Sequence, residues 1–475
     1  MAGAGIRRAH SLGILLAPSV LLFVFARPAA AFQVSVETQA ASIVQPQSGI
    51  APDKIVEAIT AARAEIARDP KSASGYLALG RALRIAGDTD GAGRALERAL
   101  TIDPQLSGAW YEKGLMSLDG GTLPQATALF NKAVKFDPAN APARMELASL
   151  LLRRGDLTNA QAQLEAVLRL DPSNAGAHDG LGLIGVQRGK PEQAIEEFKR
   201  AVALQPSFPE AEESLGEALL QTGDWPAARA ALEKALAGNL ADTSMATYAL
   251  ASALKHLGQS AAADAEFAKA RDLIQRQVAL DRARGNNDRG LQLWYQGDLQ
   301  GAEAAFRQAL ADDPTYAEAH NNLGGVLWQL KKPDEAHDQF AAAVAAKPDF
   351  AKALNNLGNV LLNEGKSEEA VREFRAAIAA QPGFTSAHLN LAIALMKDGN
   401  DQSASQEIAR TLALDPDMAE AHLEKGLLLV SESNRLTHDA RIELEASLHM
   451  NPELWAAIPV PVYEELLMGP AELKP

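Results

Sequence analysis

Three asparagines recur at 34-residue intervals in the second half of the chain: Asn322, Asn356 and Asn390. A carboxamide group both donates and accepts hydrogen bonds, so a row of them can pair with the N–H and C=O groups of an extended peptide. The same row could instead hydrogen-bond from one repeat to the next and serve only the fold, and the sequence leaves both interpretations open. The other candidate peptide-binding residues lie near this row on the same predicted face: Asn321, Asn355, Asn359, Trp328, Tyr295 and Lys352.

Four histidines share another repeated position: His178, His320, His388 and His422. Imidazole is a common metal ligand, but equivalent side chains on neighbouring helix pairs lie roughly 10 Å apart, which is too far for one ion with short ligand bonds. The chain has no cysteine and therefore no thiolate site or disulfide. We therefore expect no metal.

One glycine pattern matches the dinucleotide-binding fingerprint: Gly180, Gly182 and Gly185. That fingerprint works only between a strand and a helix, and here the predicted context is the interior of a helix. Neither Gly-x-Ser-x-Gly nor His-Glu-x-x-His nor a phosphate-binding loop occurs in the sequence. The sequence thus predicts no catalytic residue and no cofactor.

The whole pattern follows a 34-residue period, seen in prolines at 70, 104, 138, 172 and 206 and again at 314, 348, 382 and 416. A small residue recurs near the middle of a predicted first helix, as at Gly324, where only a short side chain lets a second helix cross closely. The second helix carries an alanine and, four residues later, a bulky residue on the same face, as at Ala336 and Phe340. The alanines are the most regular feature: Ala92, Ala126, Ala160, Ala194, Ala228, Ala263, Ala302, Ala336, Ala370, Ala404 and Ala440.

Two signals predict where the helices end. Nine units carry a glycine in the middle of the hairpin, where a helix stops in a left-handed conformation, and Lys331 takes its place in a tenth. The second helix ends at Asp-Pro in several units, as at Asp103-Pro104. Proline suits the first turn of the following helix, so we expect the aspartate to be its N-cap.

These repeated positions resemble the tetratricopeptide repeat (TPR) family over residues 73–452. The resemblance implies an all-α fold, a right-handed α-solenoid of about eleven helix-turn-helix units in two sub-arrays, which binds proteins. The runs Asn321-Asn-Leu-Gly and Asn355-Asn-Leu-Gly-Asn359 resemble the TPR superhelix of O-linked N-acetylglucosamine transferases. That resemblance implies a groove whose asparagines hold a peptide backbone, without the glycosyltransferase domain.

The N-terminal residues predict export. Arg7 and Arg8 precede an apolar run at 12–26 and the small residues of 29–31, the pattern of a cleaved signal peptide, with an uncleaved membrane anchor as the alternative. We therefore expect a periplasmic or extracellular protein. The predicted organisation is a signal peptide (1–31), a flexible spacer (32–51), an N-terminal capping helix (52–72), a first TPR array (73–270), a helical connector (271–282), a second TPR array (283–452) and a C-terminal cap or tail (453–475).

Charge narrows the class of partner. The formal net charge is −15, and it becomes −18 without residues 1–31, which hold three arginines and no acidic residue. Such a chain repels nucleic-acid phosphates and anionic membranes. The sequence therefore predicts a non-enzymatic scaffold that binds a protein or peptide segment in its concave groove. The alternatives are an accessory subunit of an envelope enzyme or of a secretion or assembly complex, and a purely structural spacer.

Overall fold

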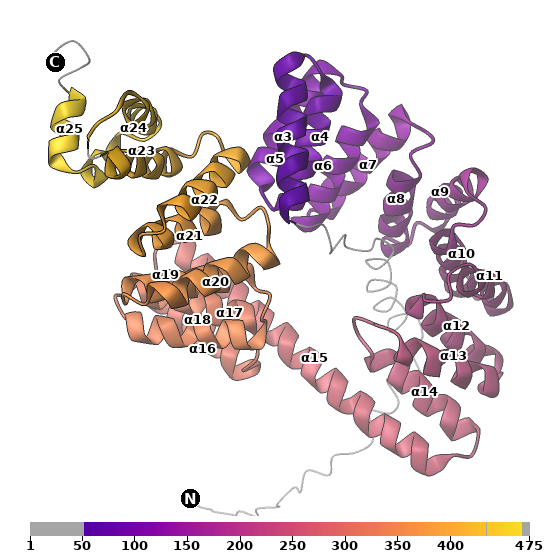
Figure 1. The fold of residues 1–475 in the computed structure, drawn as a ribbon. Helices are drawn as coiled ribbons and strands as arrows, with labels where there is room; N and C mark the ends of the chain where they lie inside the picture. Colours follow the sequence, from indigo (N-terminus) through magenta and orange to yellow (C-terminus); the bar gives the residue numbers. More distant parts are fainter. Residues whose placement is uncertain (1–51, 434, 468–475) are drawn as a thin grey trace, which may run out of the picture. The chain divides into compact units, whose positions relative to one another are not determined.

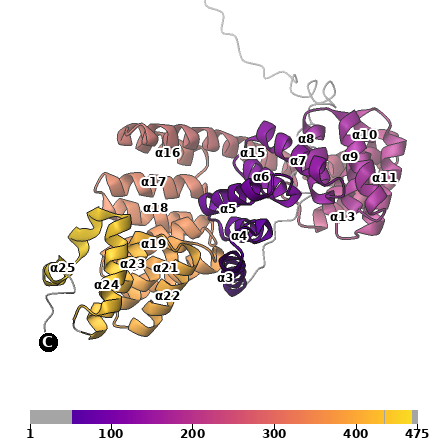
Figure 2. The ribbon, with the colours of Figure 1, turned by 90° about the horizontal axis from the view of Figure 1, so that it is seen from above.

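The computed structural model describes residues 52–433 and 435–467, and these residues form helices and turns with no β-strand among them. The predicted signal peptide and spacer lie outside the described residues. The first helices of the hairpins are α4 (Ala73–Ala86), α6 (Ser107–Asp119), α8 (Ala141–Arg153), α10 (Ala175–Gln187), α12 (Pro209–Thr222), α14 (Ser244–His256), α17 (Ala317–Gln329), α19 (Ala351–Asn363), α21 (Thr385–Lys397) and α23 (Ala419–Ser433). The second helices are α5 (Thr89–Ile102), α7 (Leu123–Phe136), α9 (Leu157–Leu170), α11 (Pro191–Leu204), α13 (Trp225–Ala237), α16 (Leu299–Asp312), α18 (Pro333–Ala346), α20 (Ser367–Ala380), α22 (Asp401–Leu414) and α24 (His438–Met450). The expected all-α solenoid of stacked helical hairpins is confirmed, and Figure 2 shows α16, α17 and α18 lying side by side.

One helix, α15 (Ser260–Tyr295), is 36 residues long and serves two hairpins (Figure 1). Its first part is the second helix of the hairpin that α14 opens, and its last part is the first helix of the hairpin that α16 closes. Residues 271–282 lie within it, with neither glycine nor proline to interrupt the helix. The division of the repeats into two arrays at this segment stays a prediction.

The described chain groups into two compact units. Residues 144–267 form unit 1, and residues 52–143 with 268–467 form unit 2. At the N-terminal side of unit 2, helix α3 (Pro52–Arg68) packs Ile55 and Ile59 against α4. At its C-terminal side, the 3-10 helix η1 (Pro452–Ala457) is followed by helix α25 (Val460–Leu467). Ile458, the C-cap residue of η1, and Leu466 of α25 pack against the last hairpin.

The hairpin turns follow the predicted glycine rule. Among the described residues, Lys331 is the one non-glycine residue with a positive φ, which is 62°. It occupies the turn position where the other hairpins have glycine. The glycines have φ between 69° and 88°, a region that costs an L-residue energy because of its Cβ. They are Gly87, Gly121, Gly155, Gly189, Gly223, Gly258, Gly297, Gly365 and Gly399.

The predicted role of the Asp-Pro pairs is wrong. Asp103 is the C-cap of α5 rather than the N-cap of the next helix, and α6 begins only at Ser107. The Asp103 side chain accepts a hydrogen bond from the backbone N–H of Gln105 (2.9 Å), which stabilises a turn that contains Pro104. The same bond recurs at Asp137, Asp171, Asp313 and Asp415. Aspartate N-caps occur instead after the turn glycines, at Asp88, Asp156, Asp224 and Asp298.

The core confirms the predicted contact between small and bulky residues. All eleven repeated alanines of the second helices are at most 1% exposed. The bulky residue four positions later lies directly over the small residue of the first helix. At Gly324, for example, an added Cβ would lie 2.7 Å from Cε1 of Phe340. The same overlap occurs between Gly114 and Phe130, Gly182 and Phe198, Gly290 and Phe306, and Gly358 and Phe374.

This contact predicts opposite effects of the same substitution at two glycines. Gly324→Ala should lower the free energy of unfolding by roughly 1–3 kcal/mol, because its Cβ overlaps the buried Phe340 ring. Gly285→Ala, in α15, should raise it by roughly 0.5–1 kcal/mol, because a Cβ there meets no described atom within 4 Å and alanine favours a helix. Urea unfolding of both variants measures this. Equal effects at the two sites would contradict the packing described.

Candidate functional site

The candidate asparagines form a hydrogen-bonded row, which we call the asparagine ladder: Asn287, Asn321, Asn322, Asn355, Asn356 and Asn390. Counted from the first residue of each repeat (283, 317, 351 and 385), these are positions 5 and 6. Each position-6 side chain donates from Nδ2 to Oδ1 of the position-5 side chain in the preceding repeat, at 2.9 Å. The pairs are Asn322 with Asn287, Asn356 with Asn321, and Asn390 with Asn355.

The ladder is more buried than the sequence suggested. We expected both positions to face an open groove, but Asn287 and Asn355 are 4% and 6% exposed, and the other four side chains are half-buried. The reason is that neighbouring first helices pack closely enough for the two carboxamides to meet between them. The ladder therefore contributes hydrogen bonds between repeats in the free protein, whatever else it binds.

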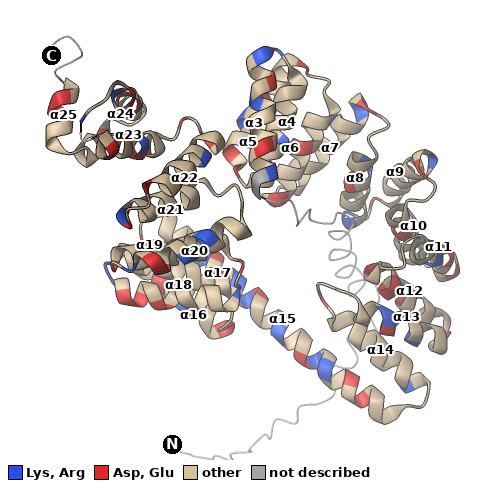
Figure 3. Cartoon of the chain, viewed as in Figure 1, with Lys and Arg blue, Asp and Glu red and all other residues tan. Residues whose placement is uncertain are grey.

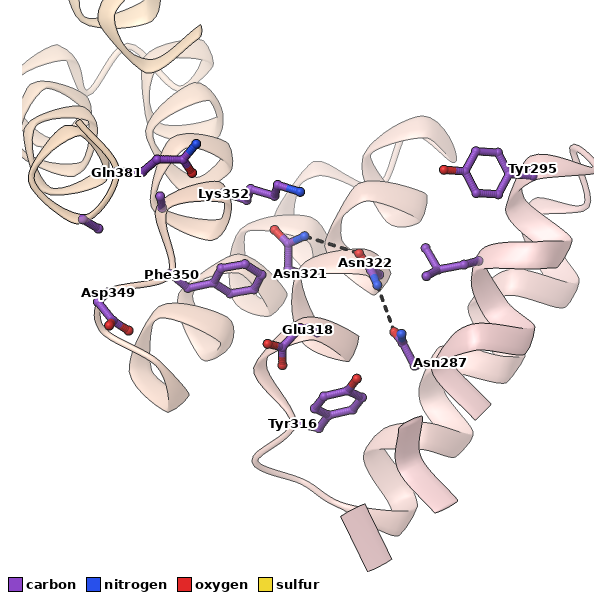
Figure 4. Close-up of a pocket in the computed structure, with 13 residues that line it drawn as sticks. Asn287, Tyr295, Tyr316, Glu318, Asn321, Asn322, Asp349, Phe350, Lys352 and Gln381 are labelled. Atoms are coloured by element: carbon purple, nitrogen blue, oxygen red, sulfur yellow. Dashed lines mark hydrogen bonds between the residues drawn. The ribbon is translucent and has the colours of Figure 1, made fainter. Parts of the chain in front are cut away.

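A surface hollow of about 610 Å³ lies beside the first rungs of the ladder (Figure 4). It brings together four of the predicted residues, Tyr295, Asn321, Asn322 and Lys352. Asn355, Asn356, Asn359, Asn390 and Trp328 are not among its lining residues. Tyr295 is 91% exposed at the end of α15, and Asn321 donates to Oδ1 of Asn322 at 3.4 Å.

The hollow also contains residues that the sequence analysis missed. Tyr316 and Phe350 are half-buried residues that precede α17 and α19, and each is the N-cap residue of its helix. Their 34-residue spacing, continued at Phe384, was the signal that could have revealed them. Glu318, Asp349 and Gln381 complete its polar side, and Glu318 lies 3.7 Å from Nζ of Lys347.

The charges around the hollow are mixed. Lys352 contributes a positive charge, whereas Glu318 and Asp349 contribute negative ones. Burial and the nearby Glu318 carboxylate raise the pKa of Tyr316, so its hydroxyl stays protonated and can donate a hydrogen bond. The arrangement offers aromatic surface, a cation and several carboxamides.

The four repeated histidines are engaged within their own hairpins. Nε2 of each ring lies 2.9–3.3 Å from the carbonyl oxygen of a proline six residues earlier, and a carbonyl only accepts, so Nε2 is a donor in this contact. Nδ1 lies 2.5–2.8 Å from a side-chain oxygen of the second helix. The partners are Glu197, Gln339, Glu407 and Glu443 for His178, His320, His388 and His422.

These pairs perturb the carboxylates. Burial by itself raises the pKa of Glu407, but the hydrogen bond from His388 and the charge of Arg410 outweigh it, and the pKa lies below its usual value. The pKa of Glu443 is lowered in the same way by Lys425 and His422. Such pairs bind a first helix to its second helix and account for the recurring histidine.

The glycine pattern in α10 is also accounted for by packing. A Cβ at Gly182 would overlap the ring of Phe198, and one at Gly180 would lie 2.8 Å from Leu164. Among the described residues, no three His, Cys, Asp or Glu side chains are grouped so that they could hold a metal ion. In the same part of the chain, no helix is long and apolar enough to span a membrane.

Comparison with known proteins identifies the repeat. A family model described as "Tetratricopeptide repeat" matches residues 54–107, 145–209, 287–351, 326–383 and 355–419, more than half of the chain. A second model with the same description matches residues 186–247. Among curated proteins, none matches this chain.

Solved structures resemble parts of the chain only distantly. The structure titled "Functional Characterization of Pseudomonas Aeruginosa pilF" is 22% identical, covers 44% of this chain and 93% of its own, and has a TM-score of 0.39. "Crystal structure of MamA" is 21% identical over 34% of this chain and 95% of its own, with a TM-score of 0.32. "Crystal structure of APC/C hetero-tetramer Cut9-Hcn1" is 12% identical over 92% of this chain and 99% of its own, with a TM-score of 0.34.

Proposed function

Since this chain belongs to the tetratricopeptide repeat family, whose members are generally non-catalytic scaffolds, we propose that it binds an extended segment of a partner protein along the asparagine ladder and the adjoining hollow. The observation that carries this proposal is the ladder itself. It fixes the orientation of six carboxamides on neighbouring first helices, next to an exposed tyrosine and a lysine.

The ladder bonds leave hydrogen-bonding capacity for a ligand. Each carboxamide has two N–H donors and an oxygen with two lone pairs, and one ladder bond uses one N–H or one lone pair. A bond that already orients the group lowers the entropy lost when a peptide binds. The resemblance of the Asn321 and Asn355 runs to the peptide-binding groove of O-linked N-acetylglucosamine transferases also supports this role.

The hollow supplies the side-chain recognition in this proposal. Tyr295, Tyr316 and Phe350 offer aromatic surface for an apolar or aromatic residue of the segment. Lys352, and Lys397 at the end of α21, favour an acidic segment, although Glu318 and Asp349 oppose them. A purely structural ladder is the alternative that the following experiment separates from peptide binding.

We expect two sets of substitutions to weaken peptide binding, but only one of them to lower the stability of the fold. The double variant Tyr295→Ala with Lys352→Ala should bind a peptide selected from a random library about tenfold more weakly than the wild type. Its free energy of unfolding should be unchanged, since both side chains are exposed. The triple change Asn322→Ala, Asn356→Ala and Asn390→Ala should weaken binding and also lower the free energy of unfolding, by about 0.5–1.5 kcal/mol for each lost bond. Fluorescence anisotropy and urea unfolding measure the two effects.

The matched control is Trp455→Ala, which removes another exposed aromatic residue, in η1, and should leave binding unchanged. If the triple variant were less stable but bound the peptide as tightly as the wild type, the ladder would be structural only.

Export is part of the proposal and is supported by the sequence alone. The small residues at 29–31 fit a signal-peptidase site, so the mature chain should begin at or near Phe32. N-terminal sequencing of the protein from the extracytoplasmic fraction tests this. An intact Met1 in the membrane fraction would indicate an anchor instead.

A further inference from the structure

Four acidic residues lie on two neighbouring first helices of unit 1, and we call them the acidic stripe: Asp179 on α10, and Glu210, Glu213 and Glu217 on α12. These two helices pack against each other, and their acidic residues are red in Figure 3. The three glutamates follow one another at spacings of three and four residues, so they share one face of α12. Asp179 and Glu213 occupy position 5 of their repeats, the position that Asn321 and Asn355 occupy in the asparagine ladder.

Among the described residues, no positive charge compensates two members of the stripe, Asp179 and Glu217. Asp179 is 1% exposed, and its Oδ1 accepts no hydrogen bond from any described residue. Burial, with a contribution from Glu210, raises the pKa of Asp179 to about 7. Burial, with a contribution from Glu213, raises the pKa of Glu217 to about 8. Desolvated carboxyl groups without a cation are costly to ionise, and this cost falls when a cation arrives.

The chain itself shows how such a carboxylate is satisfied. Glu112, at position 6 of the repeat that α6 opens, is 2% exposed. Its two oxygens accept from Nε of Arg81 (2.6 Å) and Nε of Arg84 (2.9 Å). These arginines are positions 9 and 12 of the preceding first helix, α4. Two guanidinium groups thus neutralise one buried carboxylate.

The corresponding positions near the acidic stripe are not basic. In α8, which precedes α10, positions 9 and 12 are Ser149 and Leu152. In α10, which precedes α12, they are Leu183 and Val186. Lys234 on α13 does bind a carboxylate of α12, but that carboxylate is Glu212, at position 4, which is not a member of the stripe. Nζ of Lys234 lies 3.3 Å from Oε1 of Glu212.

We propose that the acidic stripe is a second binding site, which takes an arginine-bearing segment of a partner protein. The half-buried Glu210 and Glu217 are two helical turns apart and would each pair with a guanidinium group, with Asp179 and Glu213 behind them. Guanidinium suits this place better than ammonium because it is more weakly hydrated and binds carboxylates in a bidentate manner. The site lies in unit 1, so it does not depend on peptide binding at the asparagine ladder.

The test measures the affinity of the full chain for a hexa-arginine peptide, with hexa-citrulline as the uncharged probe of the same shape. We expect saturable binding of hexa-arginine, at least tenfold tighter than that of hexa-citrulline. Asp179→Asn with Glu217→Gln should weaken it by about tenfold or more. Thermal unfolding of this variant should be unchanged or shifted upward, because it removes two desolvated carboxyl groups.

The control variant, Glu192→Gln with Asp264→Asn, makes the same two kinds of substitution at exposed positions of unit 1 and should bind like the wild type. Equal weakening in both variants would show general attraction to a negative chain and overturn the proposal. So would unchanged affinity in Asp179→Asn with Glu217→Gln. A lower unfolding temperature for that variant would also overturn it, because the carboxyl groups would then be structural.

Discussion

The close contact between a small residue of the first helix and a bulky residue of the second determines the geometry of every hairpin. Where Phe340 lies over Gly324, or Phe374 over Gly358, there is no room for a Cβ atom. The alanine one turn before the bulky residue is buried at the same crossing, as Ala336 is. Because this crossing recurs every 34 residues within runs of repeats, neighbouring first helices inside a unit, such as α17, α19 and α21, pack in the same register.

That constant register explains how one fold presents different chemistry. In the asparagine ladder, positions 5 and 6 of neighbouring first helices meet, so the side chains that the sequence places there form a row. In unit 2 the row is a set of paired carboxamides, whereas in unit 1 it includes Asp179 and Glu213. The Glu112 carboxylate is already paired with Arg81 and Arg84 of the same chain. In both binding proposals the ligand contacts these rows, whose residues can change without changing the contacts that hold each hairpin.

Much of the fold could be predicted from the sequence because it depends on local rules. The turn glycines, and Lys331 in place of one of them, were correct because a left-handed residue must end each first helix. The Asp-Pro pairs were misassigned because aspartate serves both as an N-cap and in a turn, and only the observed start of α6 at Ser107 separates the two.

The candidate site was less predictable because it depends on contacts between repeats. Its position could be read from the spacing of Asn322, Asn356 and Asn390, but the burial of Asn355 results from the distance between adjacent helices. The hollow beside it is lined by Tyr316 and Phe350, which lie in the loops before α17 and α19. A prediction based on the residues of one helix face does not include loop residues. That Oδ1 of Asp179 accepts no hydrogen bond from a described residue became visible only with its neighbours in place.

The central claim is that each hairpin is stabilised by its own contact between a small and a bulky residue, and that destabilising one hairpin affects only its neighbouring hairpins. Hydrogen exchange of the wild type and an Ala336→Leu variant, followed by mass spectrometry, tests it most directly. Overpacking at this buried alanine should cost roughly 1–3 kcal/mol and lower amide protection in α16–α20, with protection in α9–α13 unchanged. Equal loss of protection in both regions would show that the helices unfold as one cooperative body, and it would contradict the account.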